Sequence, residues 1–187
     1  MSTTSNLYKS QIQNRNFLSP VGFKFILNRA PKVAFFSNVA NIPTLTLGTT
    51  VQPNYLVDSQ IPGEKIDFEE FTLQFLIDEN LENYMEIQNW IRGIGFPESL
   101  SQIYQFQKEP TINDKSVKQL NLYSDGTLLV LNNSLNTQVK VIFRDMFPYS
   151  LSSLDFDATS TDVQYFTASV TFKYSYYEIY DKKGNEL

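Results

Sequence analysis

The chain has 187 residues, of which 42% are hydrophobic and 19% charged, and its formal net charge is −5. This length fits one domain with a sizeable core, because a chain of this size buries roughly 70% of the surface that its unfolded form exposes. The sequence has no Cys and no His, which excludes a disulfide framework and the Ser-His-Asp and Cys-His catalytic mechanisms. The net negative charge argues against a main role in binding nucleic acid.

The N-terminal segment, residues 1–15, is polar, and we expect it to form an arm in front of a single β domain over residues 16–187. Neither the arm nor any later window offers the ~18 consecutive apolar residues of a membrane span. We therefore expect a soluble protein that stays in the compartment where it is made.

Two strands are predicted at the start of the folded part. Apolar residues alternate from Val21 to Leu27, which is typical of a half-buried strand. The segment Lys32–Asn38 (KVAFFSN) is rich in residues that favour strands and predicts the second one. A turn over Asn28–Pro31 would join the two strands in a hairpin.

A strand through Leu45 and Leu47 leads into a long excursion over residues 48–63, which is punctuated by Gly and Pro. Compact domains seldom carry structureless loops of more than about 12 to 15 residues unless the loop has a function. We predict an extended hairpin whose apolar residues meet another surface, although a loop folded back on its own core is the alternative. The contact candidates are Val51, Tyr55, Leu56, Val57 and Ile61.

The segment Lys65–Ile77 predicts a strand whose apolar residues change phase, so we expect a β-bulge near the Glu69–Glu70 pair. The one predicted helix follows over Glu79–Ile91, where apolar residues form a broad stripe. Asp78 is suited to cap its N-terminus and Gly93 to end it.

Residues 96–119 are polar and loop-like and predict an insertion. The Asp125–Gly126 pair then lies between apolar runs, which predicts a hairpin turn joining strands at 120–123 and 127–131. A further strand is predicted over 137–148, closed by the proline at its end.

The C-terminal segment, residues 162–180, alternates at period two and predicts one long strand. Its core face would carry Phe166, Ala168, Val170, Phe172, Tyr174 and Tyr176. Its polar face would carry Tyr165, Thr167, Ser169, Thr171, Lys173, Ser175 and Tyr177. Together with the preceding elements, this strand predicts a mainly β fold, an antiparallel β-barrel or sandwich of about seven strands with one flanking α-helix.

Chemistry-bearing clusters are few in this sequence. The carboxylate concentrations are Glu69–Glu70 and the set Asp155, Asp157 and Asp162, and solvated turns explain them better than a metal or catalytic site. The glycines are isolated, so no phosphate-binding loop is indicated. We expect no catalytic residues, no metal and no cofactor. The C-terminal tyrosines could stack sugars or bases, but core and subunit packing is the better interpretation because only Lys173 supplies a basic partner.

The order of elements carries a family resemblance. A strand pair and a long Pro/Gly-marked hairpin precede the strand IDFEEFTLQFLIDE, which runs into the helix NLENYMEIQNWI. The chain ends with FPYSLSSLDFDATSTDVQYFTASVTFKYSYYEI. From about Asn16 to Tyr180 it resembles the tail tube proteins of contractile-tailed bacteriophages. The most specific parts are the strand-to-helix junction and the terminal FP, SL, LDFD and aromatic strand order.

The resemblance implies a non-enzymatic subunit that forms stacked hexameric rings around a channel for DNA. Its implied partners are further copies of itself, a tail sheath protein, and baseplate hub and tape-measure proteins, with no membrane. The protein would be made in the host cytoplasm and work in the virion tail. The hairpin at 48–63 would reach an adjacent subunit or ring, and the polar residues Thr167, Ser169, Thr171 and Lys173 would face the channel. The polar stretch at 96–119 departs from the family pattern.

Two alternatives remain open at this point. A baseplate-proximal tube initiator or cap protein would share the same fold. A monomeric β-barrel that binds a glycan or peptide on its tyrosine face would need no assembly at all.

Overall fold

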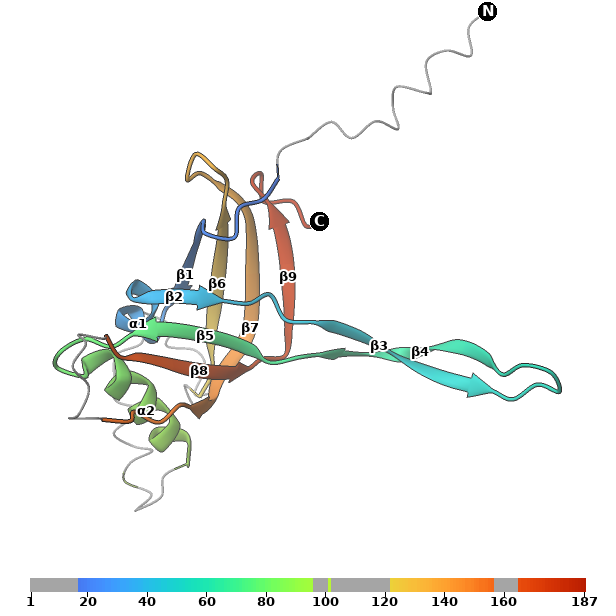
Figure 1. Ribbon diagram of the computed structural model, residues 1–187, viewed down its shortest axis with the longest axis horizontal. Helices are drawn as coiled ribbons and strands as arrows, with labels where there is room; N and C mark the ends of the chain where they lie inside the picture. The colour runs from blue at the N-terminus through green and yellow to red at the C-terminus, as the bar shows by residue number, and fades with distance from the viewer. Residues whose placement is uncertain (1–16, 96–100, 102–121, 157–164) are drawn as a thin grey trace, which may run out of the picture.

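A computed structural model of the chain describes residues 17–95, 101, 122–156 and 165–187. The predicted arm at residues 1–15 and nearly all of the predicted insertion at 96–119 lie outside the described residues. The elements of the described part are β1 (Phe23–Leu27), α1 (Pro31–Phe35), β2 (Ser37–Ala40), β3 (Leu45–Gln52), β4 (Ser59–Phe68), β5 (Phe71–Leu76), α2 (Glu82–Gly95), β6 (Ser124–Leu131), β7 (Thr137–Leu151), β8 (Thr167–Lys173) and β9 (Tyr176–Asp181) (Figure 1).

The fold is mainly β, as predicted, and its strands pair antiparallel in open sheets that pack as a sandwich without closing into a barrel. The described residues contain nine strands and two helices, against the predicted seven and one. No helix in the described ranges is long and apolar enough to cross a membrane.

The long strand β7 belongs to two sheets. Its first half pairs with β6 and β9, which gives sheet A the order β1-β6-β7-β9. Its second half pairs with β8, which gives sheet B the order β7-β8-β5-β2. The strands of sheet A cross those of sheet B (Figure 1), so one strand joins the two layers of the sandwich. The prediction that Pro148 closes this strand is wrong, since β7 runs on to Leu151.

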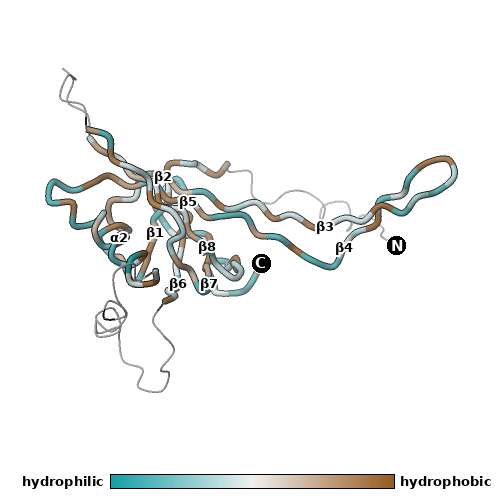
Figure 2. Tube along the Cα trace, turned by 90° about the horizontal axis from the view of Figure 1, so that it is seen from below, coloured by the Kyte–Doolittle hydropathy of each residue, from teal (hydrophilic) through white to brown (hydrophobic). Residues whose placement is uncertain are grey.

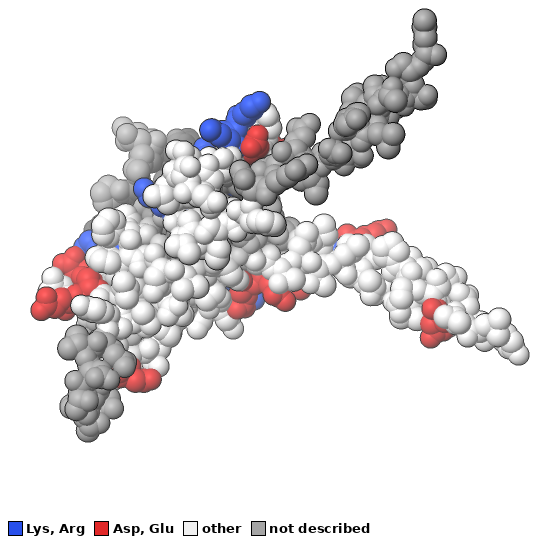
Figure 3. Space-filling model, turned by 45° about the horizontal axis from the view of Figure 1, so that its top comes forward, with Lys and Arg blue, Asp and Glu red and all other residues white. Residues whose placement is uncertain are grey.

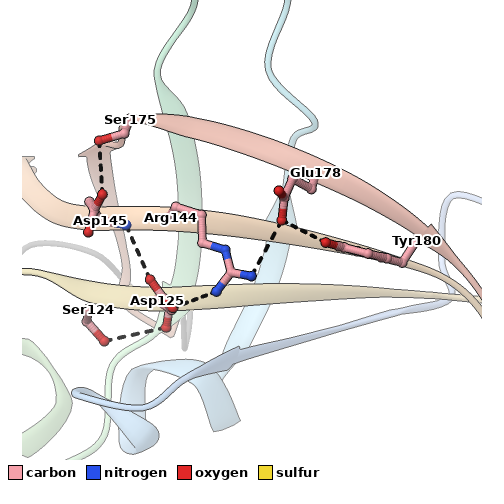
Figure 4. Close-up of polar contacts among 7 residues, drawn as sticks. All are labelled: Ser124, Asp125, Arg144, Asp145, Ser175, Glu178 and Tyr180. Atoms are coloured by element: carbon pink, nitrogen blue, oxygen red, sulfur yellow. Dashed lines mark hydrogen bonds and ion pairs between the residues drawn. The ribbon is translucent and has the colours of Figure 1, made fainter. Parts of the chain in front are cut away.

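A polar network marks the point where β7 passes from sheet A to sheet B. Asp145 has a φ of 55°, and its N–H donates to the Asp125 carboxylate at 3.3 Å. Arg144 bonds Asp125 at 3.0 Å and Glu178 at 3.4 Å (Figure 4). The hydrogen bond to Asp125 is the main cause of the raised pKa of Arg144. This network fixes the bend from both neighbouring strands of sheet A.

The predicted hairpin turn at Asp125–Gly126 is wrong, because both residues lie inside β6. The pairing register shifts between Ser124 and Gly126, which makes the pair a bulge beside the bend of β7. A Cβ at Gly126 would lie 2.4 Å from the Met146 sulfur. Gly126 therefore allows Met146 to pack closely against β6, and it does not form a turn.

The core lies between the facing sides of the two sheets. The Phe71 ring from β5 lies 5.1 Å from the Phe25 ring and 4.6 Å from the Phe143 ring, so residues of both sheets meet at its centre. Burying one such side chain contributes about 1.5 to 3 kcal/mol to the free energy of unfolding. Trp90 of α2 packs on Phe172, 6.2 Å between rings, and closes one end of this core.

The predicted strand over Lys32–Asn38, and with it the first hairpin, is wrong. Residues 31–35 form the short helix α1, and β1 pairs with β6 instead of β2. Pro31 opens the helix with its preset φ, and the side chain of Val33 is fully buried. An ion pair from Lys32 to Glu82 ties this helix to α2. Contacts distant in the sequence thus outweigh the local strand propensity.

The predicted helix exists but is shifted toward the C-terminus. It begins at Glu82, after Leu81 adopts a φ of 59°, and the Asp78 carboxylate still accepts the N–H of Asn83 at 3.1 Å. Gly93 does not end the helix. It is buried within α2.

The single long strand predicted at the C-terminus is two strands. It breaks at Tyr174 and Ser175, and the Ser175 N–H donates to the carbonyl of Arg144 at 3.0 Å. The break reverses the predicted sides of two tyrosines: Tyr177 packs against the core, whereas Tyr176 is 44% exposed. Upstream of the break, the core face is as predicted for Ala168, Val170 and Phe172, which are buried, but the prediction for Phe166 is wrong, because that residue is 40% exposed.

Candidate assembly surfaces

A two-stranded hairpin of β3 and β4 projects far from the body of the protein (Figure 1). It continues the β2–β5 pair of sheet B, since β2 leads into β3 and β4 leads into β5. The structure thus places the predicted excursion at 48–63 inside a longer hairpin that spans 45–68. The eight residues of β3 alone extend over about 25 Å at the usual rise of a strand.

The part of the hairpin next to the body has an apolar side. The cross-strand pairs Leu45–Phe68 and Leu47–Ile66 lie on one side, and Thr46–Asp67 lies on the other. Leu45, Leu47 and Ile66 remain about half exposed. Because Phe68 contacts core tyrosines, this exposed apolar side continues the core side of sheet B.

The five predicted contact residues do not form one surface. Tyr55, Leu56 and Val57 lie together at the tip, and Tyr55 is 100% and Leu56 86% exposed. Figure 2 shows hydrophobic residues at this tip. Val51 pairs with Gln60 and Ile61 pairs with Thr50, so Val51 and Ile61 point to opposite sides of the ribbon. In a single chain Val51 is 50% and Ile61 41% exposed.

Two tyrosines anchor the base of the hairpin. The Phe68 ring lies 6.2 Å from the Tyr174 ring and 5.5 Å from the Tyr177 ring. The Tyr174 hydroxyl donates to the carbonyl of Glu69 at 2.7 Å, and the Tyr177 hydroxyl donates to the carbonyl of Pro43 at 3.4 Å. Burial raises the pKa of Tyr174 to about 12. Both strands of the hairpin are therefore held where they leave the body.

Two glycines let the hairpin strands approach each other closely. A Cβ at Gly63 would lie 2.6 Å from the carbonyl oxygen of Gly48. The strand register also shifts here, between Leu47 and Thr49. The register shift lies beside Gly48 and Gly63, and it divides the hairpin into a base and a tip.

The outer face of sheet B is polar and nearly uncharged. Thr72 pairs with Thr171, Gln74 with Ser169 and Leu76 with Thr167. The neighbouring residues Leu73, Val170 and Phe172 are buried on the other face. The four predicted channel-facing residues therefore share one exposed or half-exposed face: Thr167, Ser169, Thr171 and Lys173.

The charged residues at the margin of this face are paired. Lys173 bonds Glu70 at 2.8 Å, and this hydrogen bond raises the pKa of Lys173. Its ammonium group also lies 5.2 Å from the centre of the Tyr149 ring. Local sequence patterns could not predict Glu70 or Tyr149 as neighbours of Lys173, because the contacts link segments about 100 and 24 residues apart.

Both edges of sheet B are open in the described structure. β2 pairs with β5 alone, and β7 beyond Phe147 pairs with β8 alone. A sheet with two open edges exposes unpaired backbone N–H and C=O groups that can pair with another chain. Sheet A differs, since a turn after β9 brings the C-terminal residue back to bond Ile179.

The described residues hold no group of carboxylates with the arrangement of a metal site. Glu70 is engaged by Lys173, and the backbone of Glu69 bonds Thr44 and Tyr174. Asp157 and Asp162 lie outside the described residues. On the face shown in Figure 3, charged side chains are sparse over the middle of the body, and acidic ones mark the hairpin.

The comparison with protein families gives one match. The model of the family described as phage tail tube protein matches residues 3–180. The search of curated proteins returns no match to this chain.

Solved structures with the same fold come from contractile injection systems. A chain of the structure of the anti-feeding prophage cap, which terminates the tube, is 17% identical, with a TM-score of 0.54, over 97% of this chain and 99% of that one. A chain of the sheath-tube complex of an extracellular contractile injection system is 14% identical, with a TM-score of 0.54, over 96% and 99%. A chain of the anti-feeding prophage baseplate is 13% identical, with a TM-score of 0.56, over 86% and 92%. With the family model covering nearly the whole chain, this protein belongs to the phage tail tube protein family.

Proposed function

We propose that this tube subunit assembles into stacked hexameric rings around a channel through which DNA passes. The observation that supports the proposal is the construction of sheet B, which has a buried apolar face, a polar face on which Lys173 is paired with Glu70, and two open edges. Pairing the β2 edge of one copy with the β7 edge of the next would satisfy both edges and close the sheet around an axis.

In this arrangement the polar face lines the channel. Thr167, Ser169 and Thr171 present hydroxyl groups, and the Lys173 charge is balanced by Glu70. A bore without a net positive field does not retain the phosphate backbone, because retention needs concentrated Lys and Arg. DNA would then pass without specific binding, and no residue has a catalytic role in the proposal.

The hairpin supplies the contacts between subunits or rings. Its tip residues Tyr55, Leu56 and Val57 are exposed apolar groups on a projecting element, and Val51 and Ile61 add one contact on each side of the ribbon. Exposed apolar surface of this kind is typical of an interface. A monomeric glycan-binding or peptide-binding module gives the hairpin no role, and the core packing of Tyr174 and Tyr177 leaves them poorly placed to stack a ligand.

The proposed partners follow from the same assembly. A sheath protein would surround the tube in the virion tail, with tape-measure protein in the channel and hub proteins at the baseplate. A tube initiator or cap at one end of the tail is the second candidate, because similar chains occur in the structures of a baseplate and of a tube-terminating cap. We propose synthesis in the host cytoplasm before incorporation into the tail.

Size-exclusion chromatography with light scattering and negative-stain electron microscopy test the proposal. A tube subunit is expected to give a species with six times the 21.6 kDa mass of one chain, seen as rings or stacked tubes with a central hole. A monomer at every concentration, with no rings even when a tube end is supplied as a template, would contradict it.

A further inference from the structure

A short segment folds back over one edge of sheet A. We call residues 185–187 the strap, because they run back along β9 after a turn over residues 182–184 (Figure 1). The strap pairs antiparallel with β9, and Tyr180 lies opposite Glu186. Both edges of sheet B, in contrast, are open in the described residues. The two sheets therefore differ in how their edges are covered.

The strap bonds backbone groups that β9 turns away from β7. The Leu187 N–H donates to the carbonyl of Ile179 at 2.9 Å, and the Asp181 N–H donates to the carbonyl of Asn185 at 2.8 Å. The Gly184 N–H closes the turn by donating to the carbonyl of Asp181 at 2.9 Å. Alternate residues of an antiparallel strand direct both backbone groups to the same side. The strap thus occupies the side of β9 on which a further strand would pair.

Backbone bonds and one glycine hold the strap in place. Gly184 has a φ of 82°, a conformation that is unfavourable for residues with a Cβ. Side chains contribute little, since every residue from 182 to 187 is exposed and Leu187 is 75% exposed. A Cβ at Gly184 would have no atom within 4 Å. A substitution at Gly184 therefore strains the turn without disturbing the core.

β9 does not depend on the strap for its place in sheet A. It pairs with β7 along its whole length, and Tyr177 and Ile179 pack against the core. Glu178 also accepts a hydrogen bond from Arg144 at 3.4 Å (Figure 4). Loss of the strap would leave β9 folded, with one edge uncovered.

The opposite edge strand of sheet A is protected in a different way. β1 has five residues and pairs with β6 alone, and short edge strands offer few backbone groups to a partner. Lys24 adds an exposed charge to this strand, and lysines at a sheet edge also discourage pairing. Both edges of sheet A are therefore poor sites for a further strand, whereas the edges of sheet B are open.

We propose that the strap is an edge guard, which keeps β9 from pairing with the β9 of a second copy. Two such strands would pair antiparallel about a twofold axis and join the sheets A of both copies. With this edge covered, the open edges of sheet B are favoured for pairing between copies. The inference rests on the proposed function in this last respect, because the ring is built from the sheet B edges.

A chain that stops after Gly184 tests the guard, because it loses the strap and keeps Lys182 and Lys183. Light scattering is done at a concentration where the unchanged protein is one species, and we expect additional species of at least twice its mass. In those species the amide hydrogens of Ile179 and Asp181 should exchange slowly, since a partner strand covers them. No additional species, or association without protection of these amides, overturns the inference.

A disulfide across the strap separates the guard from a general loss of folding. Tyr180→Cys with Glu186→Cys places thiols on two residues that lie directly opposite each other. Such pairs have Cα atoms about 4.5 to 5.5 Å apart, within the range of a disulfide, and the chain has no other Cys. Added to Gly184→Val, which is expected to associate like the shortened chain, the oxidised cysteine pair should restore the mass of the unchanged protein.

Gly95→Val is the matched control for Gly184→Val. It adds the same side chain at a glycine that has room for a Cβ and does not have a positive φ, so we expect no additional association. Equal association of both valine variants, or association that persists after the disulfide has formed, overturns the inference.

The mass of the unchanged protein separates this inference from the proposed function. If the unchanged chain is a monomer at every concentration, the ring proposal fails, and the shortened chain should still form pairs. If both chains form the same rings and nothing larger, the edge guard is overturned and the ring proposal stands.

Discussion

The Tyr174 hydroxyl donates a hydrogen bond to the carbonyl oxygen of Glu69, with 2.7 Å between the two oxygens. Tyr174 follows the last residue of β8, and Glu69 lies between β4 and β5, 105 residues earlier. The bond therefore joins the base of the hairpin to the point where the C-terminal segment leaves sheet B. It holds one strand of the hairpin where that strand leaves the body.

Tyr174→Phe removes the hydroxyl and keeps the ring. We expect the free energy of unfolding to fall by about 1 kcal/mol, the usual net contribution of one hydrogen bond. Amide hydrogen exchange at residues 66–70 is expected to become faster. Tyr176→Phe is the matched control, because that exposed side chain has no hydrogen-bond partner among the described residues. Equal effects of both substitutions would show that the Tyr174 hydroxyl has no special role.

Alkaline pH is expected to weaken the fold through the same residue. Burial raises the pKa of Tyr174 to about 12, above the value near 10 of an unfolded chain. Between these values the unfolded chain loses the phenol proton and the folded chain keeps it, so stability is full below about pH 10 and falls toward pH 12. Denaturant titrations at a series of pH values measure the slope. Tyr174→Phe should flatten that slope, and an unchanged slope would contradict this origin.

Period-two alternation allowed several elements to be predicted from the sequence. It predicts β1, β5 and β8 because each has one face on the core, as the buried Val170 and Phe172 show. The apolar stripe of α2 is equally clear, although its first turn is displaced by the bend at Leu81. Local patterns were sufficient for these elements.

The secondary-structure predictions were wrong where contacts between segments distant in the sequence determine the backbone conformation. The sequence KVAFF favours a strand, but the helix α1 is held by Pro31 and by contacts with α2 some 50 residues later. The Asp125–Gly126 pair has the composition of a turn, yet Arg144 and Asp145 of the neighbouring strand engage Asp125 within a bulge.

Gly63→Ala tests the close approach within the hairpin. The added methyl group would meet the backbone carbonyl of Gly48 at 2.6 Å, so the strands must move apart. We expect weaker assembly by light scattering, with core stability changed by less than about 0.5 kcal/mol because the hairpin lies outside the core. Gly95→Ala is the control, since a methyl group there meets nothing within 4 Å. Normal assembly of Gly63→Ala would refute the need for this hairpin geometry.

The double variant Leu56→Asp with Val57→Asp tests the hairpin tip. Both side chains are exposed in one copy, so we expect the stability of the single chain to stay within about 0.5 kcal/mol. Burying unpaired carboxylates at a contact costs several kcal/mol, and stacked tubes should therefore disappear from electron micrographs. Leu135→Asp provides an exposed control elsewhere and should leave the tubes intact. Tubes from the tip variant would argue against an assembly role for the hairpin.

Added lysines test the neutral channel face. In Ser169→Lys with Thr171→Lys, each copy gains two positive charges on the outer face of sheet B. We expect tubes assembled with short DNA duplexes to protect that DNA from nuclease at low salt and to lose it as salt is added. The unchanged protein should protect none. Thr127→Lys with Leu129→Lys places the same charge on the outer face of sheet A, and equal protection by that variant would contradict the assigned channel face.

A reconstruction of assembled rings by cryo-electron microscopy tests the central claim most directly. We predict six copies whose sheets B join through the β2 edge of one copy and the residue 147–151 edge of the next. Thr167, Ser169 and Thr171 should face the bore in that reconstruction. A bore lined by the outer face of sheet A, or copies whose sheet B edges do not meet, would contradict the account.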